Sequence, residues 1–261
     1  TRIGSHFATS RGSNVRRSLT VCVEYDDLLA LTLPGNSRHF DECWVITAPK
    51  DSLTPPVVAR LGDKGKLFVT DAFYRHGAVF NKGLAVEECL DAMGRTGTMA
   101  IIDADTALPV TIPWAEMQKN KLYVPRRRML TDVTLWRSDM DWQDFPLNPE
   151  AEFPGYCQIF QAEDPKLVCR RPWYGVNWRH AGGCDSDFQM IWEGADRVRP
   201  RFEVLHLGPD GHNWCGRRSE RLDGFDLLDA ETRARRARDM HLLNTDREFR
   251  YGKLDVTGAS T

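Results

Sequence analysis

The stretch MAIIDADTALP, residues 99–109, sets the interpretation of the whole sequence. A short apolar run ending at Ile102 is typical of a buried strand, and Asp103 and Asp105 follow it directly. Two carboxylates at positions i and i+2 of an extended chain share one face and repel each other. A divalent cation removes that repulsion, because Mg²⁺ and Mn²⁺ prefer oxygen ligands and keep positions open for phosphate. The alternative is a solvated turn capped by aspartate.

Strands and helices alternate through the hundred residues that lead to this stretch. Apolar, β-branched runs predict the strands, while carboxylates, an N-cap and a stop residue mark the helices. The predicted strands span 19–23, 43–47, 66–70 and 99–102, and the predicted helices span 25–33 and 81–94. Pro34 is expected to kink or end the first helix. This alternation predicts an α/β fold with a mostly parallel sheet between helical layers.

Polar or acidic residues follow each predicted strand, at the sheet edge where ligands bind in such folds. These strand ends are Glu24–Tyr25, Thr47–Asp51, Thr70–Asp71 and Asp103–Asp105. A further candidate, His206, ends the apolar run of a predicted strand over 202–208. A lone histidine there is usually structural, but beside an acidic pair its neutral imidazole is a plausible third metal ligand.

The pattern changes after about residue 110, where aromatic residues, prolines and arginines replace clear periodicity. We predict short strands and long loops over 111–180, with the clearest strand at 156–160. A helix is predicted over 183–194, and a charged helix begins near residue 228. All these elements are expected to form a single domain.

Composition narrows the protein class without identifying a partner. The 261-residue chain has a formal net charge of −2, which indicates neither a nucleic-acid nor a membrane partner. Its seven cysteines are scattered without a CxxC pair and are expected to be reduced thiols. No apolar run approaches the roughly 18 residues of a membrane span. A cytoplasmic protein is therefore predicted.

In this context the sequence resembles the GT-A-fold glycosyltransferases that use nucleotide sugars. The resemblance is strongest to family-2-like and beta-1,4-galactosyltransferase-like members, in a short phage or environmental form. It is carried, in the family's order, by VCVEYDD (21–27), FNKGLAVEECL (80–90), IIDADTALP (101–109), GGCDSDF (182–188) and HLG (206–208). It implies a Rossmann-like GT-A fold. Two departures are Cys184, where the family often has an acidic residue, and the lack of a tryptophan directly before it.

The resemblance also implies a division of the chain. Residues 18–110 would form the nucleotide-sugar-binding half and residues 111–225 the acceptor-binding half. From the residues themselves, 226–261 are expected to form a helical C-terminal tail, and 1–17, with GSH at 4–6, a disordered or cloning-derived extension.

The donor site implied by the resemblance contains a metal and a nucleotide. Asp105 and His206 would bind Mn²⁺ or Mg²⁺, and Asp103 would contact the ribose or bind the metal through water. The residues expected to contact the UDP-sugar are Glu24, Tyr25, Asp51, Asn81, Lys82, Gly83 and Asp103. Lys82 and the N–H groups at its helix start would face a phosphate, and Gly83 would let the backbone come close. The structural alternatives are a surface tyrosine, a helix cap and a solvated lysine.

The acceptor hydroxyl needs a carboxylate base, and GGCDSDF offers Asp185 and Asp187. By position in the motif we favour Asp187 as the base and Asp185 as a ligand of the acceptor or the sugar. Alternatively, Asp185 simply caps the helix that follows. The oligomeric state is left open.

The activity implied by the resemblance is metal-dependent, inverting transfer of a sugar from a UDP-sugar to an acceptor hydroxyl. Residues 119–137 and 169–180 mix cations with aromatic residues, as in proteins that neutralise phosphates and stack on bases. Because the chain resembles short phage proteins of this family, and some related enzymes glycosylate hydroxymethylated bases in phage DNA, the resemblance implies 5-hydroxymethylcytosine in phage DNA as the favoured acceptor. The alternatives are a glycan or small-molecule acceptor, or a nucleotide-binding module without catalysis.

Overall fold

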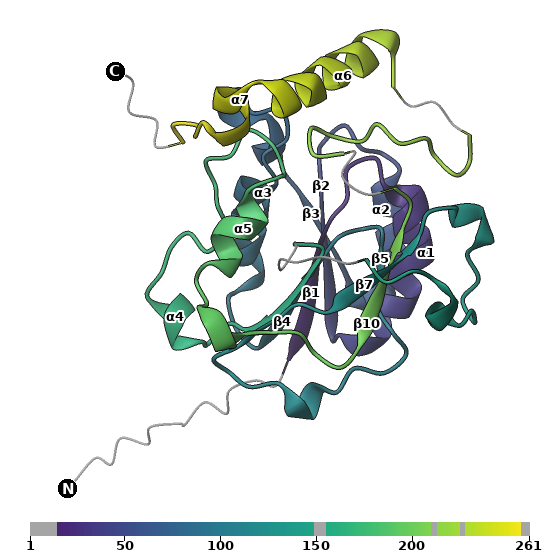
Figure 1. Cartoon of the computed structure of the whole chain (residues 1–261), viewed down its shortest axis with the longest axis vertical. Coiled ribbons are helices and arrows are strands. Elements are labelled where there is room, and N and C mark those ends of the chain that lie inside the picture. The colour runs from purple at the N-terminus through teal and green to yellow at the C-terminus, as the bar shows by residue number, and fades with distance from the viewer. Residues whose placement is uncertain (1–14, 149–154, 210–212, 225–227, 257–261) are drawn as a thin grey trace, which may run out of the picture.

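A seven-stranded sheet runs through the centre of the molecule (Figure 1). The computed structural model describes residues 15–148, 155–209, 213–224 and 228–256. In spatial order the strands are β3 (Gly65–Val69), β2 (Glu42–Thr47), β1 (Arg16–Val21), β4 (Thr98–Ile102), β8 (Cys157–Gln161), β6 (Leu122–Tyr123) and β9 (Arg197–Val198). Strands β3, β2, β1 and β4 are mutually parallel, whereas β8 is antiparallel to both β4 and β6.

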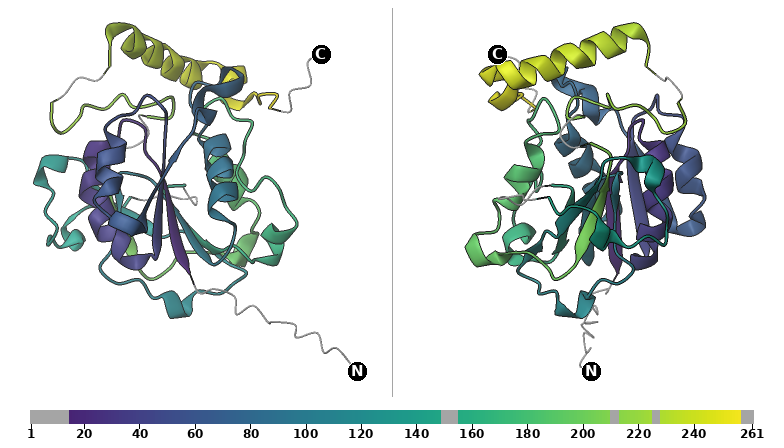
Figure 2. Two further views of the ribbon diagram at one scale, coloured as in Figure 1. Left: turned by 180° about the vertical axis from the view of Figure 1, so that it is seen from behind. Right: turned by 45° about the vertical axis from the view of Figure 1, so that its right-hand side comes forward.

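Helices cover both faces of this sheet (Figure 2). Helices α1 (Asp26–Asn36) and α2 (Thr54–Ala59) pack on one face, and α3 (Lys82–Met93), α4 (Pro165–Val168) and α5 (Cys184–Gln189) pack on the other. Helices α6 (Ala230–Thr245) and α7 (Arg247–Tyr251) belong to a separate small apolar cluster. Strand β4 is buried along its whole length and feeds both cores, because alternate side chains leave a strand on opposite faces. Met99 and Ile101 pack on the side of α3 and α5, and Ala100 and Ile102 on the side of α1 and α2.

A second, three-stranded sheet crosses the first beyond the end of β4. Its order is β5 (Thr106–Ala107), β10 (Glu203–Leu207) and β7 (Arg126–Leu130). The chain thus passes from β4 into β5 through Asp103, Ala104 and Asp105, so the acidic pair lies at the junction of the two sheets. Helix α6 lies at the top of Figure 1, and its Arg236 donates to Glu24, which follows the carboxyl end of β1.

The observed elements confirm the predicted α/β class with a mostly parallel sheet and flanking helices, which agrees with a Rossmann-like GT-A fold. Every predicted strand and helix is present, with shifted ends. Helix α3 begins after the N-cap Asn81, and Gly94 ends it with a φ of 76°. Two ends differ clearly. Helix α1 continues two residues past Pro34 to Asn36, so Pro34 does not end it. Helix α5 ends at Gln189 instead of 194.

Strand β1 begins at Arg16, so the last two residues of the predicted N-terminal extension belong to the sheet. Residues 1–14 lie outside the described part of the chain. All seven cysteines lie within it, and all are free thiols, as predicted. Among the described helices, none combines the length and the apolar character needed to span a bilayer.

Candidate active site

Asp105 and His206 are neighbours because the small sheet pairs their strands. Strand β5 runs antiparallel to β10 with Thr106 opposite His206, and the Leu207 N–H donates to the Asp105 carbonyl at 2.8 Å. This register brings His206 Nε2 to 3.6 Å from Asp105 Oδ2. Two side chains about a hundred residues apart in sequence are therefore held together by backbone pairing, and both are nearly buried.

The donor atoms of this pair fit a divalent cation. His206 Nδ1 lies 3.3 Å from the Gly208 carbonyl, and donation there leaves the Nε2 lone pair facing Asp105. The Asp105 Oδ1 atom is buried without a hydrogen-bond partner. Burial raises the pKa of Asp105, although His206 acts in the opposite direction. A buried carboxylate oxygen without a partner is costly unless a cation or a donor meets it.

Protein ligands beyond this pair are not in place. Within the described residues, no group of three or more His, Cys, Asp or Glu side chains is arranged to hold a metal. Two protein ligands still suit Mg²⁺ or Mn²⁺, because Mg²⁺ is often held by one or two carboxylates together with substrate phosphates and water. Within the described residues the pair thus offers two possible protein ligands, and its binding of a metal stays a prediction.

Asp103, the first aspartate of the motif, is held by an ammonium group. Lys82 Nζ donates to Asp103 Oδ1 at 2.8 Å and lies 3.2 Å from Asp185 Oδ1. Burial alone would lower the pKa of Lys82, but the carboxylates of Asp103 and Asp185 hold that pKa well above its ordinary value. Lys82 therefore stays charged and bridges the two acidic motifs that the sequence singled out.

The charges of this cluster do not cancel. Asp103, Asp105 and Asp185 contribute three carboxylates and Lys82 one ammonium, so two negative charges remain uncompensated when His206 is neutral. Burial strengthens the repulsion among the carboxylates, because the effective dielectric constant is lower there. A divalent cation carries the charge needed to balance the cluster.

The two candidate bases occupy different surroundings. Asp185, in the first turn of α5, faces Lys82, and its side chain is 20% exposed. Burial raises the pKa of Asp185 to about 6 despite the opposing effect of Lys82. Asp187 is 44% exposed; its Oδ2 accepts from Trp178 Nε1 at 2.7 Å and from Lys253 Nζ at 3.0 Å. The cluster around Lys82 thus includes Asp185, whereas Asp187 is tied to the C-terminal segment.

The residues around the start of α3 are fully engaged. Asn81 Oδ1 caps the helix by accepting from the Leu84 N–H at 2.9 Å, and its Nδ2 donates to the Val176 carbonyl at 2.6 Å. A Cβ atom at Gly83 would lie 1.9 Å from the Gly175 carbonyl oxygen. Gly83 is therefore needed for close approach of another backbone segment, and its predicted contact with a phosphate stays a prediction.

The loops expected to hold the nucleoside are joined by Asp51. Its Oδ2 accepts from the Glu24 N–H at 2.8 Å and from Thr47 Oγ1 at 2.9 Å, while its Oδ1 accepts from the Thr54 N–H at 3.1 Å. Asp51 thereby fixes the loop after β1 against the loop after β2 and the start of α2. Contacts of Glu24, Tyr25 and Asp51 with a nucleotide stay predictions.

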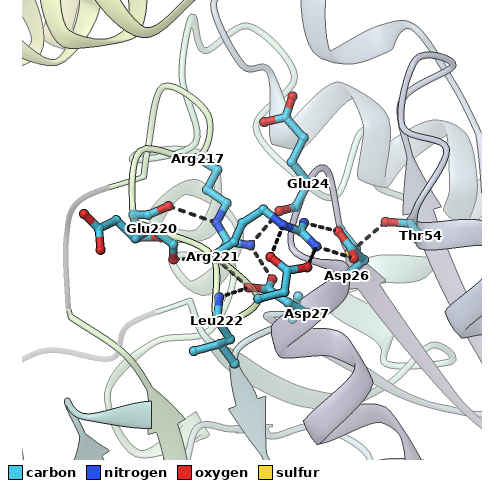
Figure 3. A network of polar contacts seen from close by, with 12 residues as sticks. Glu24, Asp26, Asp27, Thr54, Arg217, Glu220, Arg221 and Leu222 are labelled. Atoms are coloured by element: carbon cyan, nitrogen blue, oxygen red, sulfur yellow. Dashed lines mark hydrogen bonds and ion pairs between the residues drawn. The ribbon is translucent and has the colours of Figure 1, made fainter. Parts of the chain in front are cut away.

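Sequence reasoning missed three arginines that hold the loop after β1 and the first turn of α1, two of which, Arg217 and Arg221, are labelled in Figure 3. Each guanidinium pairs with a different acidic residue: Arg217 with Asp27, Arg221 with Asp26, and Arg236 with Glu24. The three arginine side chains are nearly buried. Acidic residues at 24–27 and arginines at 217–236 were the only sequence signal, and nothing in either run indicates which charges meet.

Replacing Arg217 with methionine is expected to lower the free energy of unfolding by about 3 kcal/mol, because Asp27 would remain buried without its charge partner. Urea titration measures this change. Arg137, an exposed arginine that bonds only nearby carbonyls, is the matched control, and Arg137→Met should stay within about 0.5 kcal/mol of the unmodified chain. Equal losses in the two variants would contradict this role of Arg217.

The aromatic residues of 169–180 do not form an exposed stacking surface. Trp173, Tyr174 and Trp178 are buried, with relative exposures of 2%, 1% and 9%. They pack with α3 and α5 in the main core. The prediction that these rings stack on nucleic-acid bases is therefore not supported, because hydrophobic packing already occupies them.

Comparisons with known proteins place solved transferases among the similar structures. No protein-family model and no curated protein sequence matches the chain. The 4-diphosphocytidyl-2C-methyl-D-erythritol synthase of Anaerococcus prevotii is 10% identical, with a TM-score of 0.41, over 87% of this chain and 99% of that one. The glycosyltransferase GlyE of Streptococcus pneumoniae is 10% identical, with a TM-score of 0.41, over 72% of this chain and 45% of that one.

A third similar structure contains a metal and a nucleotide. The glucosyl-3-phosphoglycerate synthase of Mycobacterium tuberculosis, in complex with Mn²⁺, UDP and phosphoglyceric acid, is 15% identical. Its TM-score is 0.32 over 44% of each chain. The chain thus spans less than half the length of either glycosyltransferase. Each of these TM-scores is below 0.5.

Proposed function

We propose that this protein is a metal-dependent, inverting glycosyltransferase that moves a sugar from a UDP-sugar to an acceptor hydroxyl. The observation that carries the proposal is the Asp105–His206 pair, with its unpartnered buried oxygen, inside a cluster that lacks two positive charges. The cluster lies beyond the carboxyl end of β4, the side of a parallel sheet where phosphates bind.

Asp105 and His206 would hold the metal, and Mn²⁺ or Mg²⁺ bound there supplies Lewis-acid stabilisation of the departing diphosphate. We assign Asp185 as the base, because Lys82 contacts both Asp185 and Asp103 and the Asp185 side chain is partly shielded from solvent. It would accept the proton of the acceptor hydroxyl during attack. Attack opposite the leaving group inverts the anomeric centre. We assign Asp187, held by Trp178 and Lys253, to binding the acceptor.

The test is turnover of a panel of UDP-sugars with and without Mn²⁺, measured as release of UDP, together with UDP binding by calorimetry. We expect metal-dependent release that an acceptor accelerates. Binding of UDP without turnover on any donor would instead identify a nucleotide-binding module and overturn the proposed activity.

The acceptor class is the finer part of the proposal. Exposed basic residues of 119–137, such as Lys119, Arg126 and Arg137, support 5-hydroxymethylcytosine in DNA. The burial of Trp173, Tyr174 and Trp178 removes the stacking part of that argument, and a glycan or small-molecule acceptor is the alternative. A base in DNA would also have to be flipped out or single-stranded to reach Asp185.

Ionic strength separates these acceptors. If DNA is the acceptor, sugar transfer to hydroxymethylated oligonucleotides should fall steeply as salt rises from about 50 to 200 mM, because phosphate contacts release counterions. Transfer to a neutral sugar should hardly change over this range. Mass spectrometry of hydroxymethylated and plain DNA, incubated with UDP-glucose and Mn²⁺, measures the product. No mass gain on hydroxymethylated DNA with several UDP-sugars would eliminate the DNA acceptor.

The pH dependence of the reaction follows from Asp185. Burial raises the pKa of Asp185 to about 6, and only the deprotonated carboxylate accepts a proton. We therefore expect kcat/KM to be low at acidic pH, to increase up to about tenfold per pH unit below 6, and to level off above it. Stopped-time assays across pH measure the profile. Asp187→Asn is the control and should keep the same inflection; a displaced inflection in that variant would assign the base to Asp187.

A further inference from the structure

Lys82 connects the metal-binding loop to the proposed base. Its Nζ donates to Asp103 Oδ1 at 2.8 Å and lies 3.2 Å from Asp185 Oδ1 and 3.3 Å from Asp185 Oδ2. An ammonium has three protons to donate, and these two carboxylates present three oxygens within reach. Asp103 lies two residues before Asp105, so one cation ties Asp185 to the strand end that carries the Asp105–His206 pair.

The backbone around Lys82 is fixed to the segment that carries Asp185. Asn81 caps α3 and also bonds the Val176 carbonyl. A Cβ at Gly83 would meet the Gly175 carbonyl oxygen at 1.9 Å and the Cβ of Cys184, the residue before Asp185, at 2.9 Å. The start of α3 is thus packed directly on the start of α5. This contact fixes the backbone of Lys82, so the ammonium group is held between Asp103 and Asp185.

A direct phosphate contact by Lys82 conflicts with these pairings. The Lys82 side chain is only 6% exposed, and its ammonium already meets two carboxylates. Turning Nζ toward a phosphate would leave Asp185, whose side chain is 20% exposed, without its cation and beside the partly exposed carboxylate of Asp103. Removing one partner from a buried ion pair is strongly unfavourable for the charge that is left.

We propose that Lys82 is a positioning residue, which holds the Asp185 carboxylate in line with the donor and does not bind the donor phosphates. This inference rests on the proposed glycosyltransferase function, and it differs from the phosphate contact predicted for Lys82 from the sequence. Its physical basis is proximity: the base has to stand at a fixed distance from the anomeric centre, and a misplacement of about 1 Å can cost about 10²-fold in rate.

The test compares Lys82→Met and Lys82→Arg with the unmodified chain. We expect Lys82→Met to lower kcat by about 10²-fold, with the dissociation constant of UDP in the presence of Mn²⁺ changed by less than about threefold. Lys82→Arg, which keeps the charge, should recover about tenfold of that loss. Initial rates give kcat and KM, and calorimetry with UDP and Mn²⁺ gives the affinity.

The outcomes separate this inference from the function on which it rests. A tenfold or greater loss of UDP affinity in either variant, with kcat preserved, would make Lys82 a phosphate ligand and overturn the inference alone. An unmodified chain that turns over no UDP-sugar overturns the proposed function and the inference with it. If Lys82→Met does not fold, the same split between kcat and UDP affinity is taken from Lys82→Arg. The control is Lys121→Met, since Asp196 keeps its second partner, Lys166.

Discussion

Replacing Asp105 with asparagine is expected to lower kcat/KM by about 10³-fold, since Lewis-acid stabilisation contributes several kcal/mol and each 1.36 kcal/mol is about tenfold in rate. Asparagine preserves the volume of the side chain but removes the charge that would hold the cation beside His206. The loss should appear with every UDP-sugar that the protein accepts. It is measured by initial rates at a series of Mn²⁺ concentrations.

The variant should also bind UDP no better with Mn²⁺ than without it, and calorimetry tests this separately. Asp91, an exposed carboxylate paired with Arg95, is the matched control, and Asp91→Asn should leave kcat/KM and the metal dependence unchanged. An Asp105→Asn protein that retains Mn²⁺-stimulated turnover would show that the Asp105–His206 pair is not the metal site.

Asp185→Asn is expected to lower kcat by about 10²- to 10⁴-fold, the usual contribution of a positioned general base. The affinity for UDP in the presence of Mn²⁺ should be preserved, because Asp185 would act on the acceptor rather than on the leaving group. Folding should also be preserved, because the substitution removes a carboxylate from a cluster with excess negative charge. Single-turnover rates at saturating donor isolate the chemical step from binding.

Asp187→Asn provides the comparison within the same helix. Asp187 is exposed and lies outside the cluster around Lys82, so we expect its loss to raise the KM of the acceptor more than it lowers kcat. If Asp187→Asn instead removes turnover while Asp185→Asn remains active, the base is Asp187, as its place in the sequence motif suggested.

The sequence predicted the order of the elements because each carries a local signal. The apolar run of β4 and the N-cap and stop residues of α3 need only their neighbours in the chain to be interpreted. The resemblance further singled out Asp105 and His206, which the structure brings to 3.6 Å from each other. Local patterns located element ends less accurately: α1 continues two residues past Pro34, and α5 ends at Gln189 instead of 194.

Partner choice among charged side chains depended on the packed structure. Lys82 could be assigned to a phosphate from its helix position, but packing of α3 on α5 directs it to Asp103 and Asp185. In the same way, Asp27, in the acidic run after β1, pairs with Arg217, which lies 190 positions further along the chain. The sequence predicted that aromatic residues of 169–180 could bind a ligand, but in the folded chain Trp173, Tyr174 and Trp178 are buried in the core.

The chain's local patterns were thus sufficient for the α/β order and for the acidic strand end that defines the candidate site. Periodicity, capping and strand-end polarity each depend on a few neighbouring residues, so they can be recognised in the sequence alone. Which carboxylate stands beside Lys82, and which arginine clamps the loop after β1, followed from contacts between segments up to 212 residues apart. Electrostatic pairing depends on distance in space and on burial, and both arise only when the sheet and its helices have packed.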